Sequence, residues 1–192
     1  LPLFIYMGFM ISESGIANDL YKMFHVLFGG LKGGLAIGTM FMMVAISAMN
    51  GLSVAGMAIG ATIALPEMLK RNYDKRMITG VVQAGSSLGI LIPPSVVMVL
   101  YGMIARQPVS KLWMAGILPG LLMASLFLIY IYVRCKLQPE LGPPLRKEER
   151  NISTVEKIRL LKAGVIPFLI FFFMTGLFLM GIASLVECSA VG

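Results

Sequence analysis

The residues of this chain that could do chemistry are uncharged, and they lie in two short polar patches inside long apolar stretches. The first patch covers residues 47–53, and the second covers residues 83–95. Neither patch contains Asp, Glu, Lys, Arg or His, which argues against a proton relay. Both are rich in hydroxyl, amide and freed carbonyl oxygens, the ligands that small hard cations prefer.

Two consecutive prolines make the second patch incompatible with a continuous helix. Pro93 and Pro94 have no backbone N–H, so the carbonyls four residues earlier lose their helical donors, and the proline rings clash with those carbonyls. The residue before a proline also avoids the helical conformation. The sequence therefore predicts a broken helix, with halves at Met77–Leu88 and Val96–Ala105.

The first patch interrupts an apolar tract of 34 residues, Gly33–Pro66. That length is too great for one spanning helix of about 20 residues and too short for two. Asn50-Gly51 is a turn signal, and Ser53 is a suitable N-cap for a following helix. We predict a re-entrant hairpin over residues 31–69, since a buried tip is allowed where it faces protein or a wet cavity; the alternative is two tilted full spans. The arms would be Gly33–Met49 and Val54–Leu65, with Pro66 ending the second arm.

Both interruptions would place helix ends at membrane depth. A helix C-terminus presents free carbonyls with partial negative charge, and a helix N-terminus presents free N–H groups with partial positive charge. Secondary transporters use such discontinuous helices to hold a cation and an anionic substrate without burying a formal charge. The predicted sodium-binding residues are Asn50, Gly51, Ser53, Ser86, Ser87, Gly89 and Ile90. The residues predicted near a substrate carboxylate are Pro93, Pro94 and Ser95.

The composition places these patches in a membrane protein. Of the 192 residues, 58% are hydrophobic and 13% are charged, whereas a soluble domain has about 45–50% and about 25%. We therefore expect an all-α polytopic bundle. Its charge-free tracts, each long enough to enter or cross a bilayer, are Gly33–Pro66, Met77–Ala105, Leu112–Val133 and Ala163–Val186.

The basic residues indicate orientation rather than nucleic-acid binding, despite a net charge of +7. Twelve of the 16 Lys and Arg residues lie in residues 66–76 and 134–162, with two apolar tracts between these stretches. Two crossings return the chain to one side, so both stretches are expected in the cytoplasm. The other expected segments are the end of a preceding transmembrane helix plus an interfacial connector (1–30), a broken helix with the following span (70–133), a cytoplasmic linker (134–162) and a truncated further helix (163–192).

Seven segments carry a more specific pattern: Leu1–Gly8, Ser14–Ala17, Gly33–Ala36, Ala64–Met68, Tyr73-Asp74, Gly89–Ser95 and Ala115–Gly120. In this order they resemble the large membrane subunit of tripartite ATP-independent periplasmic (TRAP) transporters, the DctM-like family. The resemblance runs over most of the chain. This fragment of a longer protein would supply the family's first inverted repeat, the linker and the first helix of the second repeat.

The resemblance implies an elevator-type transporter of the ion-transporter superfamily, driven by a sodium gradient across the bacterial inner membrane. Its expected partners are a small membrane subunit and a periplasmic substrate-binding protein, and its expected substrates are organic acids such as dicarboxylates or sialic acid. The family's hairpin tip would fall on Asn50, Gly51 and Ser53. The first sodium site would form between that tip and the unwound helix at Gly85–Ser95. The usual tip is Ser-Gly, where this chain has Asn50-Gly51.

Two alternative functions stay open. One is a stand-alone ion-coupled carboxylate carrier of the same superfamily, and the other is a non-transporting membrane scaffold or pore. An enzyme is not expected, because no nucleophile–base pair, phosphate loop or carboxylate pair stands out. No cofactor is expected beyond the coupling sodium ion. Tyr101, Trp113, Tyr130 and Tyr132 lie near the ends of apolar tracts, as an interfacial aromatic belt would.

Overall fold

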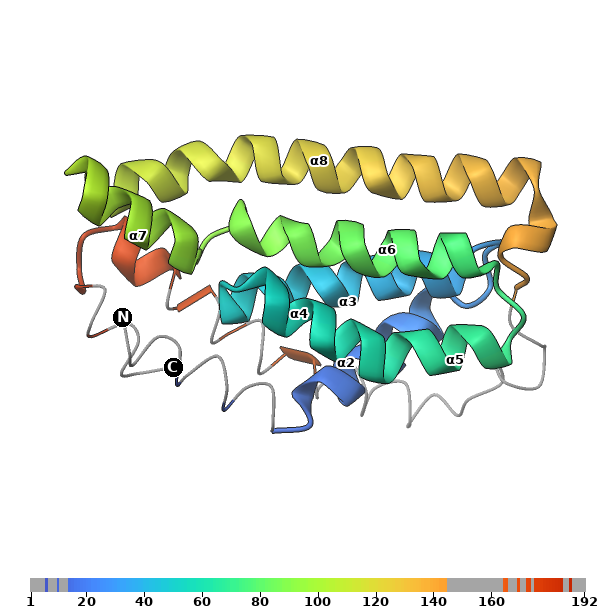
Figure 1. Cartoon of the computed structure of the whole chain (residues 1–192). Helices are drawn as coiled ribbons and strands as arrows, with labels where there is room; N and C mark the ends of the chain where they lie inside the picture. Colours follow the sequence, from blue (N-terminus) through green and yellow to red (C-terminus); the bar gives the residue numbers. More distant parts are fainter. Residues whose placement is uncertain are drawn as a thin grey trace.

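The computed structural model describes residues 14–144 without interruption. Every regular element in that part of the chain is helical, and the helices pack as an elongated bundle, in agreement with the predicted all-α class (Figure 1). Most of the predicted segments 1–30, 134–162 and 163–192 fall partly or wholly outside the described residues. Further described positions are Tyr6, Met10, Gly164, Val165, Leu169, Phe172, Phe173, residues 175–184 and Glu187.

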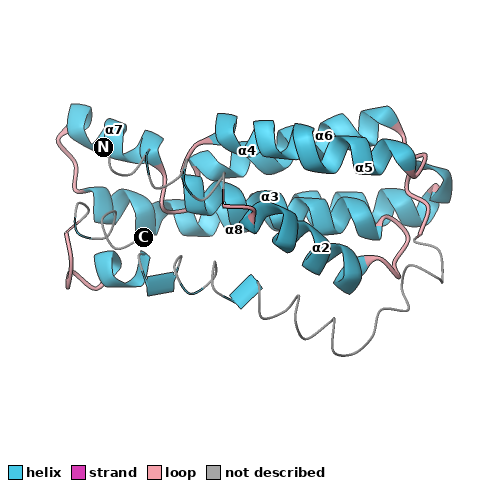
Figure 2. Cartoon of the chain, turned by 90° about the horizontal axis from the view of Figure 1, so that it is seen from below, coloured by secondary structure: helices cyan, strands magenta, loops and turns pink. Residues whose placement is uncertain are grey.

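Helix α3 is the centre of the bundle. It contacts α2, α4, α6 and α8. The view in Figure 2, turned by 90° from Figure 1, also shows α2 beside α3. The helices in chain order are α2 (Ile16–Phe28), α3 (Gly34–Asn50), α4 (Ser53–Ile59), the π-helical turn η1 (Gly60–Ala64), α5 (Leu65–Lys70), α6 (Lys75–Ser87), the 3₁₀ turn η2 (Leu88–Ile90), α7 (Val96–Ala105), α8 (Val109–Leu137) and the 3₁₀ turn η3 (Pro139–Leu141).

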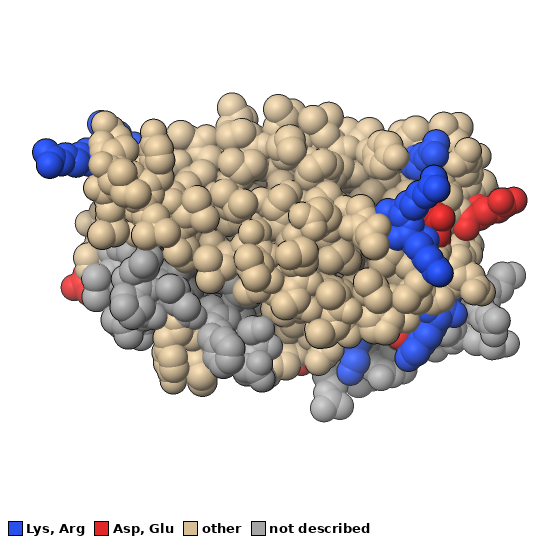
Figure 3. Space-filling model, viewed as in Figure 1, with Lys and Arg blue, Asp and Glu red and all other residues tan. Residues whose placement is uncertain are grey.

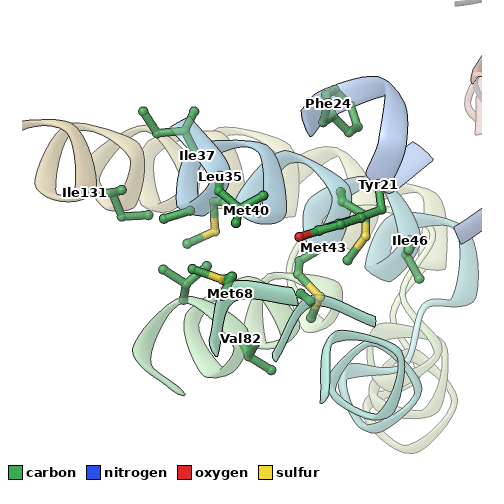
Figure 4. Close-up of a cluster of buried hydrophobic side chains, with 14 of the residues drawn as sticks. Tyr21, Phe24, Leu35, Ile37, Met40, Met43, Ile46, Met68, Val82 and Ile131 are labelled. Atoms are coloured by element: carbon green, nitrogen blue, oxygen red, sulfur yellow. The ribbon is translucent and has the colours of Figure 1, made fainter. Parts of the chain in front are cut away.

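The hydrophobic core joins side chains from five helices around α3 (Figure 4). Methionine is prominent in it, because an unbranched, flexible thioether fills irregular gaps between helices. The core residues are buried in the protein, so they mark the faces that the helices turn toward one another rather than toward lipid. Core residues of these helices are Phe24 (α2), Ile59 (α4), Met68 (α5), Val82 (α6) and Ile131 (α8), which surround residues of α3 such as Met40.

The chain reverses direction after α3, at the predicted position. Gly51 has φ 64°, a left-handed conformation that glycine adopts without steric cost, and its N–H donates to the carbonyl of Ser47 at 2.8 Å. The predicted N-cap at Ser53 is wrong. Leu52 occupies the extended capping position, and Ser53 is the first helical residue with no side-chain capping bond. The backbone alone makes this turn, because the glycine already satisfies the end of α3.

The second arm of the hairpin does not end at Pro66 as predicted, but continues to Lys70. The turn before the proline is π-helical, and the N–H of Leu65 donates to the carbonyl of Gly60. This wider turn makes room for a proline ring that would clash with the carbonyl four residues earlier in a regular helix. The arm is therefore α4, η1 and α5 in succession, running antiparallel to α3 (Figure 1).

The second predicted interruption lies where the two prolines stand. Asp74 caps α6, accepting the backbone N–H groups of Arg76 and Met77 at 3.0 and 3.1 Å. Helix α6 ends at Ser87 and passes into η2, and α7 begins only at Val96. Pro93 and Pro94 lie in the non-helical stretch between η2 and α7, as their missing N–H groups require.

Helix α8 is longer than the tract that predicted it. It has 29 residues and ends at Leu137, four residues beyond the expected end at Val133. Arg134 and Lys136 lie in its last turn, where cations interact favourably with the negative end of the helix dipole. The charges thus mark an approach to the membrane surface without ending the helix. Among the described residues, α8 is the one helix long and apolar enough to cross a bilayer by length and composition.

Charged side chains gather at the ends of the bundle (Figure 3). One end contains the end of α5, the start of α6 and the end of α8, so it carries the basic residues of residues 70–76 together with Arg134 and Lys136. Here Glu67 pairs with Arg71 at 2.6 Å, with about a quarter of each side chain exposed. The opposite end carries Arg106 and Lys111 around the turn between α7 and α8. We call the first the basic end.

Candidate functional site

The two interruptions meet in space although about 40 residues separate them in the sequence. The backbone N–H of Val96, at the start of α7, donates to the carbonyl of Gly51 at 3.1 Å. The 3₁₀ turn η2 also packs on the last turn of α3, since a Cβ added at Gly89 would lie 2.7 Å from the Cβ of Ser47. The fold therefore joins the turn between α3 and α4 to the break between α6 and α7, as the transport hypothesis requires.

Ser47 lies at the point where three elements converge. Its side chain is fully buried, and a Cβ at Gly56 of α4 would lie 2.6 Å from its hydroxyl oxygen. Together with the contact at Gly89, this places the hydroxyl between α3, α4 and η2. Within the described part of the chain, this hydroxyl has no hydrogen-bond partner. Such a group costs about 1–3 kcal/mol when it is left unsatisfied.

Sequence reasoning placed Ser47 in the first polar patch but did not select it as a ligand. A signal was present, because Ser47 lies four residues before Gly51 and therefore on the same helical face as the turn. Asn50 and Gly51 end and follow α3, and Gly51 is buried. The side chain of Asn50 lies outside the described part of the structure. Ser53 is half-buried at the start of α4.

The predicted serine ligands of α6 turn their hydroxyl protons back to the helix. Ser86 donates to the carbonyl of Gln83 at 2.9 Å, and Ser87 donates to the carbonyl of Ala84 at 2.8 Å. Each oxygen therefore keeps its lone pairs for another positive partner. Ser86 is buried, and Ser87 is half-buried. Both remain chemically suited to cation binding, although Gly89 is the residue of this stretch that contacts Ser47.

Ser95 closes the break. Its hydroxyl donates to the carbonyl of Ile90 at 2.7 Å and accepts the N–H of Met98 at 3.3 Å, which makes it the N-cap of α7. The sequence predicted a free carbonyl at Ile90, but this carbonyl accepts the hydrogen bond from Ser95. A carbonyl oxygen nevertheless has a second lone pair. Gly89 still lacks its helical donor, because Pro93 has no N–H.

The start of α7 has few free N–H groups for a substrate carboxylate in this conformation. The N–H of Val96 is bound to Gly51, and the N–H of Met98 is bound to Ser95. Pro93, Pro94 and Ser95 are all buried. A carboxylate next to this helix end would therefore require the turn and the break to move apart.

Helix α8 supports the break from the other side. The indole N–H of Trp113 donates to the carbonyl of Ser95 at 3.3 Å, and this side chain is 1% exposed. Trp113 is therefore not the interfacial belt residue predicted; its apolar ring and single donor are used inside the bundle. One turn later, a Cβ at Gly116 would lie 2.5 Å from the carbonyl oxygen of Leu91. Small residues at this spacing let helices approach closely in membranes.

The electrostatics of the site come from the backbone. The carbonyl ends of α3 and α6 and the N–H ends of α4 and α7 meet near Ser47 and Gly89. None of the described residues 47–56 and 83–96 is ionisable. Helix ends with partial charges of about half an elementary charge are thus the charge available to bind ions. Neutral oxygen ligands suit a monovalent cation, and such an arrangement of interrupted helices recurs in membrane transporters.

The whole sequence, residues 1–192, matches the sequence model of the family described as "Tripartite ATP-independent periplasmic transporter, DctM component". The chain belongs to this family of TRAP transporter large permease proteins. The family resemblance seen in the sequence is therefore confirmed. The family consists of transporters rather than enzymes.

Curated relatives in this family include permease proteins named for different substrates. The chain is 35% identical over 133 residues to the C4-dicarboxylate TRAP transporter large permease protein DctM of Pseudomonas aeruginosa, covering 69% of this chain and 31% of that protein. It is 31% identical over 154 residues to the isethionate TRAP transporter permease protein DctMQ of Oleidesulfovibrio alaskensis, covering 80% and 24%. It is 28% identical over 130 residues to the 2,3-diketo-L-gulonate TRAP transporter large permease protein YiaN of Escherichia coli, covering 67% and 30%. The matched part is thus less than a third of each relative.

Proposed function

We propose that this chain is part of the large permease subunit of a sodium-coupled transporter that imports an organic acid across the bacterial inner membrane. A periplasmic binding protein would deliver the substrate, and a small membrane subunit would assist, as a tripartite system implies. The observation that carries the proposal is the buried, unpartnered hydroxyl of Ser47 at the meeting point of two interrupted helices. A bound cation would satisfy that hydroxyl.

The hairpin of α3 and α4–α5 is proposed to be re-entrant. Both of its outer ends lie at the basic end, and its turn lies beside the break, short of the turn between α7 and α8 (Figure 1). The 17 residues of α3 correspond to about 26 Å, whereas the 29 residues of α8 correspond to about 44 Å. A hairpin that starts in the cytoplasm would therefore end inside the bilayer, next to the site.

The proposed sodium site combines side-chain and main-chain oxygens. Ser47 joins the residues predicted from the sequence, since it is buried where their elements meet. Sodium binding would hold the turn against the break, and its release would let them separate. We propose that this separation exposes the substrate-proximal residues as the hairpin and the broken helix move together in an elevator transition. The full ligand set proposed is Ser47, Asn50, Gly51, Ser53, Ser86, Ser87, Gly89 and Ile90, with Pro93, Pro94 and Ser95 near the substrate.

The proposed substrate class is a small organic acid. C4-dicarboxylate, isethionate and 2,3-diketo-L-gulonate, named for the relatives, are all organic anions. Uptake by the complete permease should require its periplasmic binding protein. Equal uptake without that protein would identify a stand-alone carrier instead, and continuous, non-saturating flux would identify a pore.

Replacing Ser53 or Ser87 with alanine in the complete permease should weaken sodium activation of uptake. One ligand to a charged partner is worth about 1.5 kcal/mol, so we expect the half-activating sodium concentration to rise about tenfold. Ser125→Ala is the matched control, because that exposed hydroxyl on α8 donates only to the carbonyl of Leu121. Uptake at several sodium concentrations measures the effect. Unchanged sodium activation in Ser53→Ala and Ser87→Ala would remove these residues from the site.

A further inference from the structure

A groove lies between α6 and α8 at the basic end, away from the proposed sodium site. It encloses about 670 Å³, with Met40 of α3 at its base. One face of α6 and one face of α8 form its walls, because the lining residues recur about once per helical turn. Arg76, Gly80 and Ala84 line it from α6, and Phe127, Tyr130 and Arg134 line it from α8.

The groove has a charged mouth and an apolar body. Arg76 and Arg134 line it where α6 begins and α8 ends. Figure 1 shows these two helix ends together at the basic end of the bundle. Farther along, the lining side chains are apolar apart from Tyr130. Among the residues that the structure describes, the ion pairs of this end join Glu67 to Lys70 and Arg71, and neither Arg76 nor Arg134 takes part in them.

Asp74 is the acidic residue of the lining, and it is already engaged. Its carboxylate accepts the N–H groups of Arg76 and Met77 as the N-cap of α6. The lining of the mouth contains two arginines and one aspartate, so its net charge is positive. An arginine binds phosphate oxygens with two parallel hydrogen bonds, so arginine side chains in the mouth are suited to a phosphate group.

The length of the groove matches one membrane leaflet. Its α6 wall runs from Asp74 to Ala84, ten residues or about 15 Å. The hydrocarbon core of a bilayer is about 30 Å thick, so this is about half of it. Leu126 and Tyr130, on the α8 wall, have more than half of their side chains exposed, so the groove opens sideways onto the apolar face of α8. A ligand with an anionic head and a hydrocarbon tail would fit both parts.

We propose that this groove binds an anionic phospholipid of the leaflet at the basic end. Its phosphate lies between Arg76 and Arg134, and one acyl chain lies along Gly80 and Phe127. Basic pockets between membrane helices on the cytoplasmic side are suited to such headgroups. The lipid would brace α6, which leads into the break, against α8, which supports it. This inference depends on the chain being in a bilayer and not on sodium coupling.

Gly80 provides a direct test, because a Cβ at this position would have no atom within 4 Å. Gly80→Phe should fill the groove without disturbing the bundle, and Gly80→Ala is the matched control. The complete permease would be placed in nanodiscs of phosphatidylglycerol and phosphatidylcholine, and retained lipids would be counted by native mass spectrometry. We expect retained phosphatidylglycerol in Gly80→Ala as in the wild type, and its loss in Gly80→Phe.

The arginines test the headgroup. A cation near an anionic membrane surface is worth about 1 kcal/mol, so Arg76→Gln and Arg134→Gln should each lower the preference for phosphatidylglycerol about fivefold. Equal retention of both lipids by the wild type, or identical retention in Gly80→Phe and Gly80→Ala, would overturn the proposal. Displacement of the lipid by millimolar inorganic phosphate would overturn it too, in favour of a simple anion site. The readout is lipid retention, so a negative result leaves the sodium proposal untouched.

Discussion

Gly89→Ala should strongly impair the complete permease, whereas Gly80→Ala should not. The new Cβ at residue 89 would lie 2.7 Å from the Cβ of Ser47 and 3.2 Å from its carbonyl oxygen. Both atoms belong to or adjoin the backbone of α3, so they cannot move aside as the end of a flexible side chain would. The 3₁₀ turn η2 must therefore move away from α3. Overpacking of this kind costs about 1–3 kcal/mol.

The expected result for Gly89→Ala is a lower thermal unfolding midpoint and at least a tenfold loss of uptake, because the separated elements no longer share a cation. Gly80→Ala makes the same chemical change on α6, where the Cβ meets no atom within 4 Å. That variant should be slightly stabilised, by about 0.5–1 kcal/mol, since alanine favours a helix more than glycine does. Similar behaviour of the two variants would contradict the close contact between the break and α3.

Ser47→Ala should separate stability from function. The change removes a buried hydroxyl that has no hydrogen-bond partner among the described residues. Without sodium, the variant should be as stable as the wild type or more stable by up to about 1–3 kcal/mol, because an unsatisfied polar group is gone. Sodium activation of uptake should nevertheless fall by about tenfold, since one ligand oxygen is lost.

Thermal unfolding with increasing sodium measures both parts of this prediction. A ligand that binds only the folded state raises its stability in proportion to the logarithm of one plus the ligand concentration divided by Kd. The midpoint of the wild type should therefore rise with sodium, and that of Ser47→Ala should rise later and less. Ser125→Ala should behave as the wild type. A variant that is destabilised without sodium yet keeps the full sodium response would show that Ser47 has a packing role only.

These two residues explain why the proposed sodium site would need no charged side chain. Gly89 lets the break approach α3, and Ser47 places an oxygen at the contact. Ionisable groups inside a membrane are costly, so helix ends and neutral oxygens are the less expensive way to bind an ion there. The proposed opening of the site would break the backbone hydrogen bond from Val96 to Gly51, which joins the break to the hairpin turn.

The sequence by itself determined the local features of this protein. Asn50-Gly51 predicts the turn, because glycine alone enters the left-handed conformation freely, and Gly51 adopts it. Pro93-Pro94 predicts the break, because two N–H groups are missing from the backbone, and α6 ends before them. These restrictions act within a few residues and need no knowledge of the rest of the chain. Family membership was likewise recognisable from short segments spread along the sequence.

Only the tertiary structure decided which side chains complete the site. Ser47, Ser53 and Ser95 are the same residue type in similar apolar surroundings. Within the described structure, however, the first is buried without a partner, the second makes no capping bond, and the third caps a helix. Trp113 is likewise buried under the break rather than placed in an aromatic belt. The physical reason is that the places of Ser47 and Trp113 depend on contacts between elements about 20 to 40 residues apart. Local conformational preference fixes where the chain bends, and packing fixes what then meets there.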